Sequence, residues 1–286
     1  MPSRTTGRLL LVIAAVVWST NGLFLKSLPG VHWLVIAGVR SLFAAIVFLP
    51  GLTAARPSRG KLLAAVLCYA ILVSALMGSM QLGTAAQGIW LQYVAPALVA
   101  LWAWLINRQR LRPTEVLAVG LTGVAIFLIV TGGHGPTHQQ SLVLGLLSGL
   151  AFASFILLLK SLGSVRPAAI FFWTNLGTAA LLLPLVVALG VPLPSGRHDL
   201  ALLAAMGMGQ VGLGYYFFHW GLARTPALEA SLIILLEPIL NPVWVYLVVG
   251  ELPSTRVILG CGLIAVGLLA FALLGNGQRG AGADVA

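Results

Sequence analysis

The chain has 286 residues, of which 59% are hydrophobic and only 8% are charged, and its formal net charge is +10. A soluble domain carries about 25% charged residues, so this composition excludes an ordinary soluble protein. The 16 lysines and arginines fall in short segments between apolar runs, which favours orientation in a membrane over binding to nucleic acid. The two cysteines lie inside apolar runs, so the sequence predicts neither a disulfide framework nor a metal site.

Hydropathy divides the chain into apolar runs, and about 20 apolar residues are long enough to span a bilayer. The first run follows Arg4 and Arg8 without a small-residue cleavage signature, so we interpret it as a retained helix and not as a signal peptide. We expect an all-α integral membrane protein with ten transmembrane helices, at 8–27, 32–50, 61–80, 84–106, 114–131, 141–161, 167–189, 199–220, 226–249 and 255–275.

The distribution of lysine and arginine predicts how the chain lies in the membrane. With a cytoplasmic N-terminus, twelve of these residues lie on the inner side, and only Lys26, Arg197 and Arg256 lie outside. Short cytoplasmic loops of membrane proteins carry the excess of positive charge. We therefore expect both termini to be cytoplasmic.

Two pairs of segments resemble each other along the chain. The first pair is WSTNGLFLKSLPG at 18–30 and FASFILLLKSLGS at 152–164; the second is VAPALVALWAW at 94–104 and LEPILNPVWVY at 236–246. The order is the same in both halves, which indicates an internal repeat of five spans.

Because five is an odd number, the second copy enters the membrane in the opposite direction. We therefore expect two inverted-topology five-helix repeats, 1–137 and 138–286, around a central cavity. Inverted repeats are typical of secondary transporters, whose substrate sites lie near the membrane midplane between the halves.

Three ionisable residues are predicted at membrane depth, where such residues usually face a bundle interior or a wet cavity. They are Arg40, Glu229 and Glu237. Arg40 has two interpretations: an ion pair with Glu237, or a contact with a substrate carboxylate, which suits the guanidinium group. Glu229 lies in the first turn of its predicted helix, where the helix dipole favours an anion, so we interpret it as structural.

Glu237 also belongs to a polar helix face. Glu237, Asn241 and Trp244 follow at i, i+4 and i+7, which places them on the same side of a helix. Pro238 has no amide hydrogen for the carbonyl of Ile234, and such carbonyls persist at membrane depth beside protein or a water-filled cavity. The face therefore either lines a transport pathway, with Glu237 accepting hydrogen bonds or a proton, or packs rigidly beside a kink.

Aromatic and amide side chains gather in spans one, four and eight. Pockets for small organic molecules combine apolar walls with a few polar groups, whereas many membrane Trp and Tyr residues are interface anchors or packing residues. Together with Arg40, Glu237, Asn241 and Trp244, the candidate pathway residues are Trp18, Ser19, Asn21, Trp90, Gln92, Tyr93, Tyr215 and His219.

Glycines in two spans predict close contacts between helices. Small residues at the helix surface let neighbouring backbones approach closely in membranes. These glycines are Gly145 and Gly149 in the sixth span and Gly207, Gly209, Gly212 and Gly214 in the eighth.

These features together resemble the EamA-type branch of the drug/metabolite transporter superfamily, over essentially the whole chain. The resemblance is carried by Trp18-Ser19, Lys26, Arg40, LLEPILNPVWVYLVVGE at 235–251 and GCGLIAVGLLAF at 260–271. It implies ten helices around a central cavity, with the fifth and tenth peripheral. It also implies transport of small metabolites, prominently amino-acid export, across a bacterial inner membrane.

Two departures from related transporters narrow this expectation. Small four-helix multidrug relatives use a first-helix glutamate for proton coupling, whereas the first span and its counterpart in this chain contain no carboxylate. Phosphate- and nucleotide-sugar carriers place paired lysines in late helices, and the last three spans contain no lysine. That proton route and a strongly anionic substrate are therefore not expected.

We expect a secondary carrier that exports neutral, aromatic or other apolar amino acids and similar metabolites by alternating access. The alternatives are a multidrug or other metabolite carrier of the same fold, a channel, or a non-transporting membrane scaffold. An enzyme is not expected, because the sequence contains no His-Glu-x-x-His or Gly-x-Ser-x-Gly motif and no cluster of Asp, Cys or His at membrane depth. We expect no cofactor and no nucleic-acid partner. The expected partners are a small-molecule substrate and the lipid bilayer, and the expected state is a monomer or weak homo-oligomer.

Overall fold

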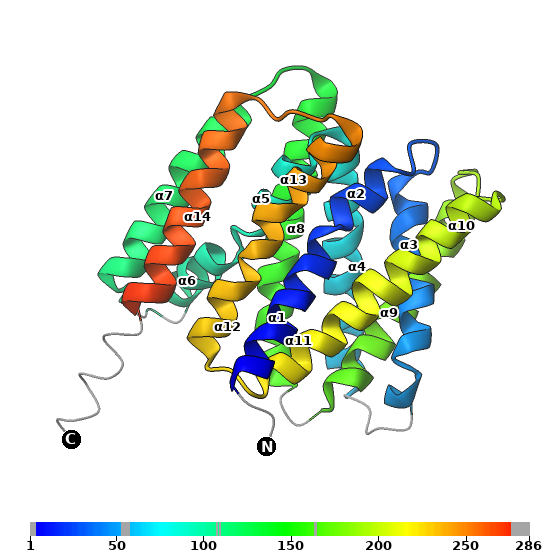
Figure 1. Ribbon diagram of the computed structural model, residues 1–286, viewed down its shortest axis with the longest axis horizontal. Helices are drawn as coiled ribbons and strands as arrows, with labels where there is room; N and C mark the ends of the chain where they lie inside the picture. Colours follow the sequence, from blue (N-terminus) through cyan, green and yellow to red (C-terminus); the bar gives the residue numbers. More distant parts are fainter. Residues whose placement is uncertain (1–3, 53–57, 107, 109, 163–164, 276–286) are drawn as a thin grey trace.

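The computed structural model describes residues 4–52, 58–106, 108, 110–162 and 165–275, and these form a bundle of helices (Figure 1). The helical elements are α1 Arg4–Ser19, α2 Asn21–Lys26, α3 Trp33–Val47, η1 Leu49–Gly51, α4 Arg59–Leu82, α5 Ala85–Gln92, α6 Ala95–Leu105, α7 Pro113–Val130, α8 Pro136–Ser161, α9 Pro167–Ala188, α10 Arg197–Ala204, η2 Ala205–Leu213, α11 Gly214–Leu222, α12 Ala227–Ile234, α13 Leu236–Val249 and α14 Thr255–Gly275. All ten predicted spans are therefore helical in this part of the chain.

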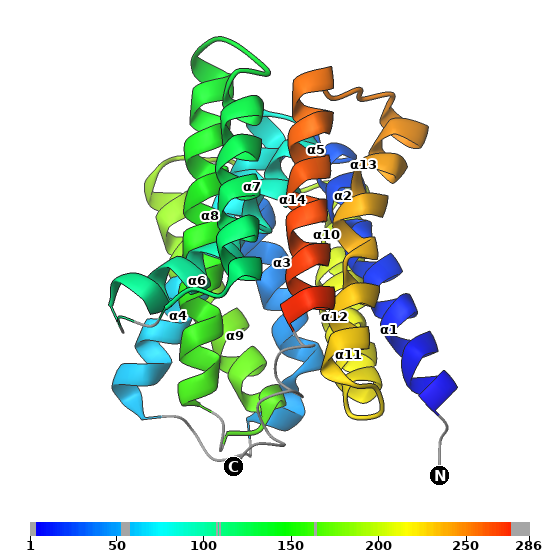
Figure 2. The ribbon, with the colours of Figure 1, turned by 90° about the vertical axis from the view of Figure 1, so that its left-hand side faces the viewer.

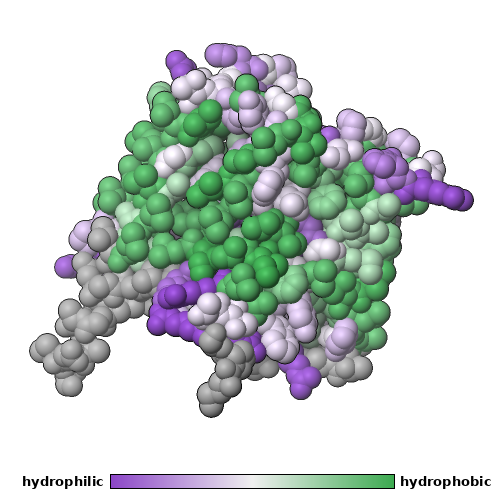
Figure 3. Space-filling view, viewed as in Figure 1, coloured by the Kyte–Doolittle hydropathy of each residue, from purple (hydrophilic) through white to green (hydrophobic). Residues whose placement is uncertain are grey.

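The helices and their surface fit a lipid environment. Within the described residues, nine helical stretches are long and apolar enough to cross a membrane, and a tenth, Trp33–Val47, is apolar but shorter. Apolar residues cover the middle of the face in Figure 3, and polar residues gather toward both ends. Large apolar side chains such as Phe127 and Leu247 are each 65% exposed. Because water disfavours an apolar surface of this extent, the chain is a multi-pass membrane protein.

Long-range contacts pair helices from the two halves of the chain. The helix pairs α3–α9 and α7–α14 each join corresponding spans, and α7 and α14 lie together at one side of the bundle (Figures 1 and 2). The pair α4–α8 and the pair α1–α11 are related by exchanging the halves. These pairs fit the expected repeat architecture with peripheral fifth and tenth spans, while the division after residue 137 stays a prediction.

Prolines interrupt two of the spans at corresponding places. α5 ends at Gln92, four residues before Pro96, and α12 ends at Ile234, four residues before Pro238. Proline offers no amide hydrogen to the carbonyl four residues earlier, so each helix stops there and a new one begins within two or three residues. The predicted effect of Pro238 on Ile234 is confirmed.

The first span breaks at Thr20 for a different reason. Ser19 Oγ donates a hydrogen bond to the carbonyl oxygen of Val16 at 2.7 Å, and Thr20 Oγ1 donates to that of Val17 at 2.6 Å. Hydroxyl groups that bond to the preceding turn compete with helical hydrogen bonding and bend helices. α1 therefore ends at Ser19, and α2 starts at Asn21.

Glycines on α8 and η2 permit the close contacts that their spacing predicted. A Cβ atom on Gly149 would lie 2.7 Å from the backbone oxygen of Leu91, and one on Gly212 would lie 2.7 Å from the side chain of Val47. A Cβ atom on Gly207 would overlap the backbone oxygen of Arg40. The expectation is wrong at Gly209, where a Cβ atom would meet nothing within 4 Å.

This difference between two glycines of one π-helical segment gives a stability prediction. Gly207→Ala is expected to destabilise the protein by about 1–3 kcal/mol, because overpacking against backbone cannot be relieved by side-chain rotation. Gly209→Ala is the matched control, and it is expected to leave stability unchanged or raise it slightly. Thermal unfolding of the two purified variants in detergent measures the difference. Equal melting temperatures would contradict the close packing of η2 on α3.

Candidate functional site

A cavity of about 310 Å³ lies inside the bundle where the interrupted spans meet. Its walls combine aromatic and aliphatic side chains with polar groups, as in pockets that bind small organic molecules. The polar lining residues are Asn21, Arg40, Tyr69, Gln92, Tyr93, Gln210, Tyr215 and Glu237, and the aromatic ones include Trp18, Phe152, Phe155, Phe171 and Phe218.

Glu237 reaches this cavity from the first turn of α13. Its Oε2 atom accepts a hydrogen bond from the Tyr93 hydroxyl at 2.8 Å, which joins the two proline-interrupted spans. The unsatisfied amides and the dipole at a helix N-terminus favour a carboxylate at this position. Glu237 is therefore held in place by one contact and one helix end, and it still faces the cavity.

Arg40 lines the same cavity from α3, and only 4% of its surface is exposed. Its Nη1 atom donates to Oδ1 of Asn21 at 3.2 Å, and its Nε atom is buried and has no hydrogen-bond partner among the described residues. Among the described residues no carboxylate lies within ion-pair distance of Arg40. The predicted ion pair with Glu237 is therefore absent from this structure, and the guanidinium group is buried without a counter-ion.

Asn241 and Trp244 face a different neighbour from Glu237. The indole Nε1 of Trp244 donates to Ser19 Oγ at 2.8 Å. Asn241 is fully buried, and a Cβ atom on Gly22 would lie 2.5 Å from its Oδ1 atom. This part of the predicted face packs α13 against the break between α1 and α2, and neither residue lines the cavity.

The other candidate residues are divided between the cavity and its surroundings. Trp18, Gln92 and Tyr215 line the cavity, and the ring of Trp18 packs edge-on against that of Tyr215 with centroids 4.8 Å apart. Trp90 is buried behind Tyr93, with a ring-centroid distance of 6.2 Å. His219 is exposed on the outside of α11.

Two polar residues of the cavity, Tyr69 and Gln210, were not predicted from the sequence. Tyr69 lies in the middle of α4 and Gln210 lies in η2. Gln210 donates from Nε2 to the carbonyl oxygen of Trp18 at 3.2 Å. A single glutamine in a glycine-rich span carries no periodic signal, and η2 is π-helical, so α-helical spacing does not place it. Its isolated polarity within an apolar run was the one available signal.

A second, larger cavity of about 500 Å³ adjoins the first and is lined by residues at the start of α7 and near the end of α14. These two helix ends lie at the same end of the bundle as the start of α1 (Figure 1). Both cavities are lined by Tyr93, Phe152, Phe218 and Ile234. The outer one also reaches Glu115 at the start of α7. The central site is therefore approached from the end of the bundle at which the described chain starts.

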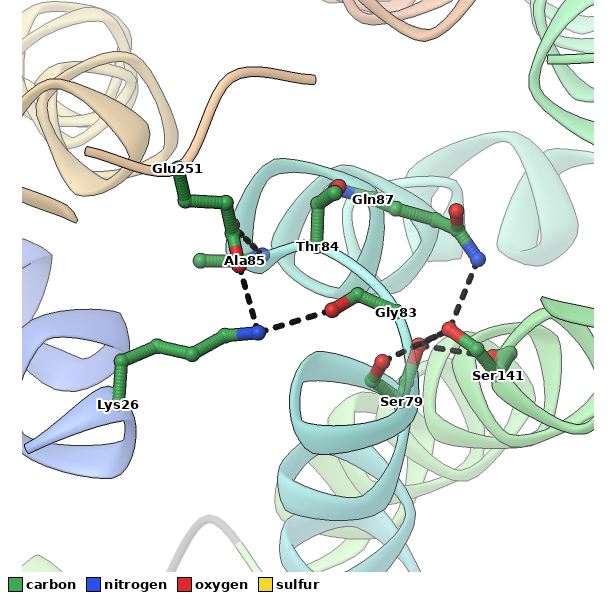
Figure 4. Close-up of polar contacts among 8 residues, drawn as sticks. All are labelled: Lys26, Ser79, Gly83, Thr84, Ala85, Gln87, Ser141 and Glu251. Carbon is green, nitrogen blue, oxygen red and sulfur yellow. Dashed lines mark hydrogen bonds and ion pairs between the residues drawn. The ribbon is translucent and has the colours of Figure 1, made fainter. Parts of the chain in front are cut away.

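The opposite end of the bundle is tied together by polar contacts (Figure 4). Lys26, the last residue of α2, pairs with Glu251 after α13, with Nζ and Oε2 2.6 Å apart. Both also hold the turn between α4 and α5: Lys26 Nζ donates to the Gly83 carbonyl at 2.9 Å, and the Ala85 amide donates to Glu251 Oε1 at 2.7 Å. These contacts join three connecting segments.

A hydroxyl and amide cluster extends this network. Ser79 Oγ donates to the Ser141 carbonyl at 2.8 Å, and Ser141 Oγ donates to the Ser79 carbonyl at 2.7 Å. Gln87 Nε2 adds a bond to Ser141 Oγ at 2.8 Å (Figure 4). Buried polar networks that are fully paired are rigid, so α4, α5 and α8 form a fixed unit here.

Glu229 lies where the sequence placed it, in the first turn of α12. It forms ion pairs with Arg4 and Arg8 of α1 at the surface. Glu229 lines neither cavity, although the next two residues, Ala230 and Ser231, line the outer one.

Comparisons with known proteins agree with this architecture. The model of the EamA-like transporter family matches residues 5–131 and again residues 139–273. An uncharacterized transporter of Archaeoglobus fulgidus is 26% identical over 269 residues, which cover 92% of this chain and 95% of the relative. An uncharacterized transporter of Clostridium kluyveri is 24% identical over 176 residues, which cover 58% of this chain and 56% of the relative. A solved crystal structure that is 19% identical superposes with a TM-score of 0.67, covering 95% of this chain and 97% of that one, so it shares the fold.

Proposed function

This chain belongs to the EamA-like transporter family, and on that premise we propose that it exports neutral amino acids, above all aromatic and other apolar ones, and similar metabolites. The carrier lies in a bacterial inner membrane with both termini in the cytoplasm, as the distribution of basic residues predicts. Transport proceeds by alternating access around the central cavity, with residues 1–137 and 138–286 moving against each other.

The observation that carries this proposal is the state of Arg40. A guanidinium group that is 4% exposed, faces a cavity and lacks a counter-ion is stabilised when a ligand supplies a carboxylate. A cavity lined by Trp18, Phe155, Phe171 and Tyr215 complements an apolar side chain on the same ligand. A neutral amino acid combines both groups.

The closed and open ends of the bundle fit one state of such a cycle. The outer cavity gives access from the end at which α1 begins, and the Lys26–Glu251 contacts close the other end. In the predicted orientation this is the state that loads substrate from the cytoplasm. Release on the other side then requires these contacts to separate.

Competition binding tests the substrate class. Purified protein in detergent is incubated with labelled phenylalanine, and unlabelled compounds compete for the site. We expect neutral aromatic and aliphatic amino acids to displace the label, and glutamate, lysine and phosphorylated sugars to displace it weakly. Displacement by lipophilic cations but by no amino acid would contradict the proposal and favour a multidrug carrier.

Glu237→Gln is expected to slow transport about tenfold with little change in melting temperature. Glutamine keeps an oxygen for the Tyr93 hydroxyl, so the fold is retained, but it removes the charged group that faces the cavity. A hydrogen bond between the substrate and a charged group in the cavity contributes about 1.5–3 kcal/mol. Transport into proteoliposomes and thermal unfolding measure the two effects. Glu229→Gln, in the same interrupted span but at the surface, is the matched control and should transport normally. If Glu237→Gln loses folding and transport together, its role is packing alone.

A further inference from the structure

The amide group of Gln210 offers an unused acceptor at the Arg40 end of the central cavity. Gln210 is 6% exposed and lines the cavity, and its Nε2 atom donates to the carbonyl oxygen of Trp18. This bond fixes the amide orientation, because the reverse orientation would place two oxygens together. Its Oε1 atom is buried and has no hydrogen-bond partner in the described part of the chain. Buried acceptors in native proteins are normally satisfied by water, protein or ligand.

Arg40 and Gln210 each form a hydrogen bond to the same short stretch of the first span. Arg40 bonds to Asn21 and Gln210 bonds to Trp18, on the two sides of the break at Thr20. The segment η2 also packs directly on α3, because a Cβ atom on Gly207 would overlap the backbone oxygen of Arg40. One corner of the cavity therefore holds an unpartnered donor, Arg40 Nε, and an unpartnered acceptor, Gln210 Oε1.

The chemistry of an amino acid matches this pair of groups. Its carboxylate and its ammonium are bonded to the same carbon, so they must be bound at one place in the cavity. Glu237 belongs to α13 and already accepts the Tyr93 hydroxyl at 2.8 Å. Gln210 Oε1 has no hydrogen-bond partner among the described residues, and Gln210 bonds to the same stretch of the first span as Arg40, so it offers the ammonium a free acceptor beside the carboxylate.

We infer that Gln210 is the residue that recognises the substrate ammonium, while Arg40 binds the carboxylate of the same molecule. This inference rests on the proposed function and adds a specificity-determining residue to it. Both residues line the cavity, and the two polar atoms are buried just behind its surface, so the substrate engages them when neighbouring side chains of the wall move aside. A π-helical segment at this point agrees with the frequent occurrence of π-bulges at functional sites.

A comparison of two competitors isolates the ammonium contact. Phenylalanine and 3-phenylpropionate differ in the amino group, and each displaces labelled phenylalanine from purified protein with its own inhibition constant. The inhibition constant of 3-phenylpropionate divided by that of phenylalanine measures how much the amino group contributes to binding. In Gln210→Leu we expect this ratio to fall about tenfold, the effect of one hydrogen bond to a charged group. The inhibition constant of 3-phenylpropionate should change little.

A matched variant and a second substitution complete the test. Gln92 lines the same cavity from α5, and Gln92→Leu should leave the ratio unchanged. Gln210→Met keeps the length of the side chain and replaces Gln210→Leu if the latter does not fold. Equal weakening of both competitors in the Gln210 variants would assign Gln210 a structural role and overturn the inference. An unchanged ratio would overturn it too, although phenylalanine binding by the wild type would still support the proposed function. If no amino acid binds the wild type, the proposed function fails first.

Discussion

Arg40→Gln is expected to reduce saturable transport of neutral amino acids by about tenfold or more, because a hydrogen bond to a charged group contributes about 1.5–3 kcal/mol. The substrate carboxylate loses its charged partner, while glutamine still offers a donor to Asn21. The measurement is the initial rate of labelled phenylalanine exchange in proteoliposomes, as a function of substrate concentration. The substrate concentration that gives half of the maximal rate should change as well as the maximal rate itself.

Arg40→Lys is the conservative control for this variant. Lysine keeps the positive charge but lacks the planar fork that binds a carboxylate with two parallel hydrogen bonds, so we expect intermediate rates. Removing the buried charge also removes its desolvation cost, so a stable Arg40→Gln protein is expected. Normal transport by that stable variant would show that Arg40 does not contact the substrate.

Lys26→Glu is expected to open the tied end of the bundle and to reduce transport by about tenfold or more, because removing one partner of a close ion pair costs up to about 2–5 kcal/mol when the pair is buried. Lys26 and Glu251 have 17% and 18% exposed side chains, and two carboxylates there repel each other and leave the Gly83 carbonyl without its donor. Accessibility of a cysteine at Leu76, which lines the central cavity, measures the opening. In a background without Cys68 and Cys261, impermeant maleimide added from that side should react faster.

The charge-swapped double variant is the control for this experiment. Lys26→Glu with Glu251→Lys restores an opposite pair, but it presents like groups to the Gly83 carbonyl and the Ala85 amide. We therefore expect partial recovery of transport and of protection from maleimide. Labelling that stays at the wild-type rate in the single variant would contradict a closing role for the pair.

Most of the fold could be predicted from local sequence properties. Apolar length identified all ten spans, and proline chemistry correctly located the break before Pro238. The break at Thr20 depends on hydroxyl groups that bond to the preceding turn, and Ser and Thr occur in many helices without that effect. The segment η2 is π-helical and packs on α3, and no local pattern in the sequence predicted its π-helical register.

The charged residues of the candidate site could be predicted from the sequence, whereas the residues whose environment depends on helix packing could not. Arg40 and Glu237 stand out in an apolar chain, and both line the cavity. Asn241 and Trp244 share a helix face with Glu237, but the close approach of α1 and α2 covers that part of the face. No local pattern in the sequence indicates how α2 packs against α13. Residue spacing alone therefore predicted that more of this helix face lines the cavity than the structure shows.

The most direct test of the account is counterflow in proteoliposomes that contain the purified protein and are preloaded with unlabelled phenylalanine. We expect saturable uptake of labelled phenylalanine and of other neutral amino acids, driven by exchange, and a strong reduction in Arg40→Gln. Applying a pH gradient in the same assay shows whether protons contribute to the driving force. If no neutral amino acid exchanges under any of these conditions, while the protein is folded and inserted, the proposed substrate class is wrong.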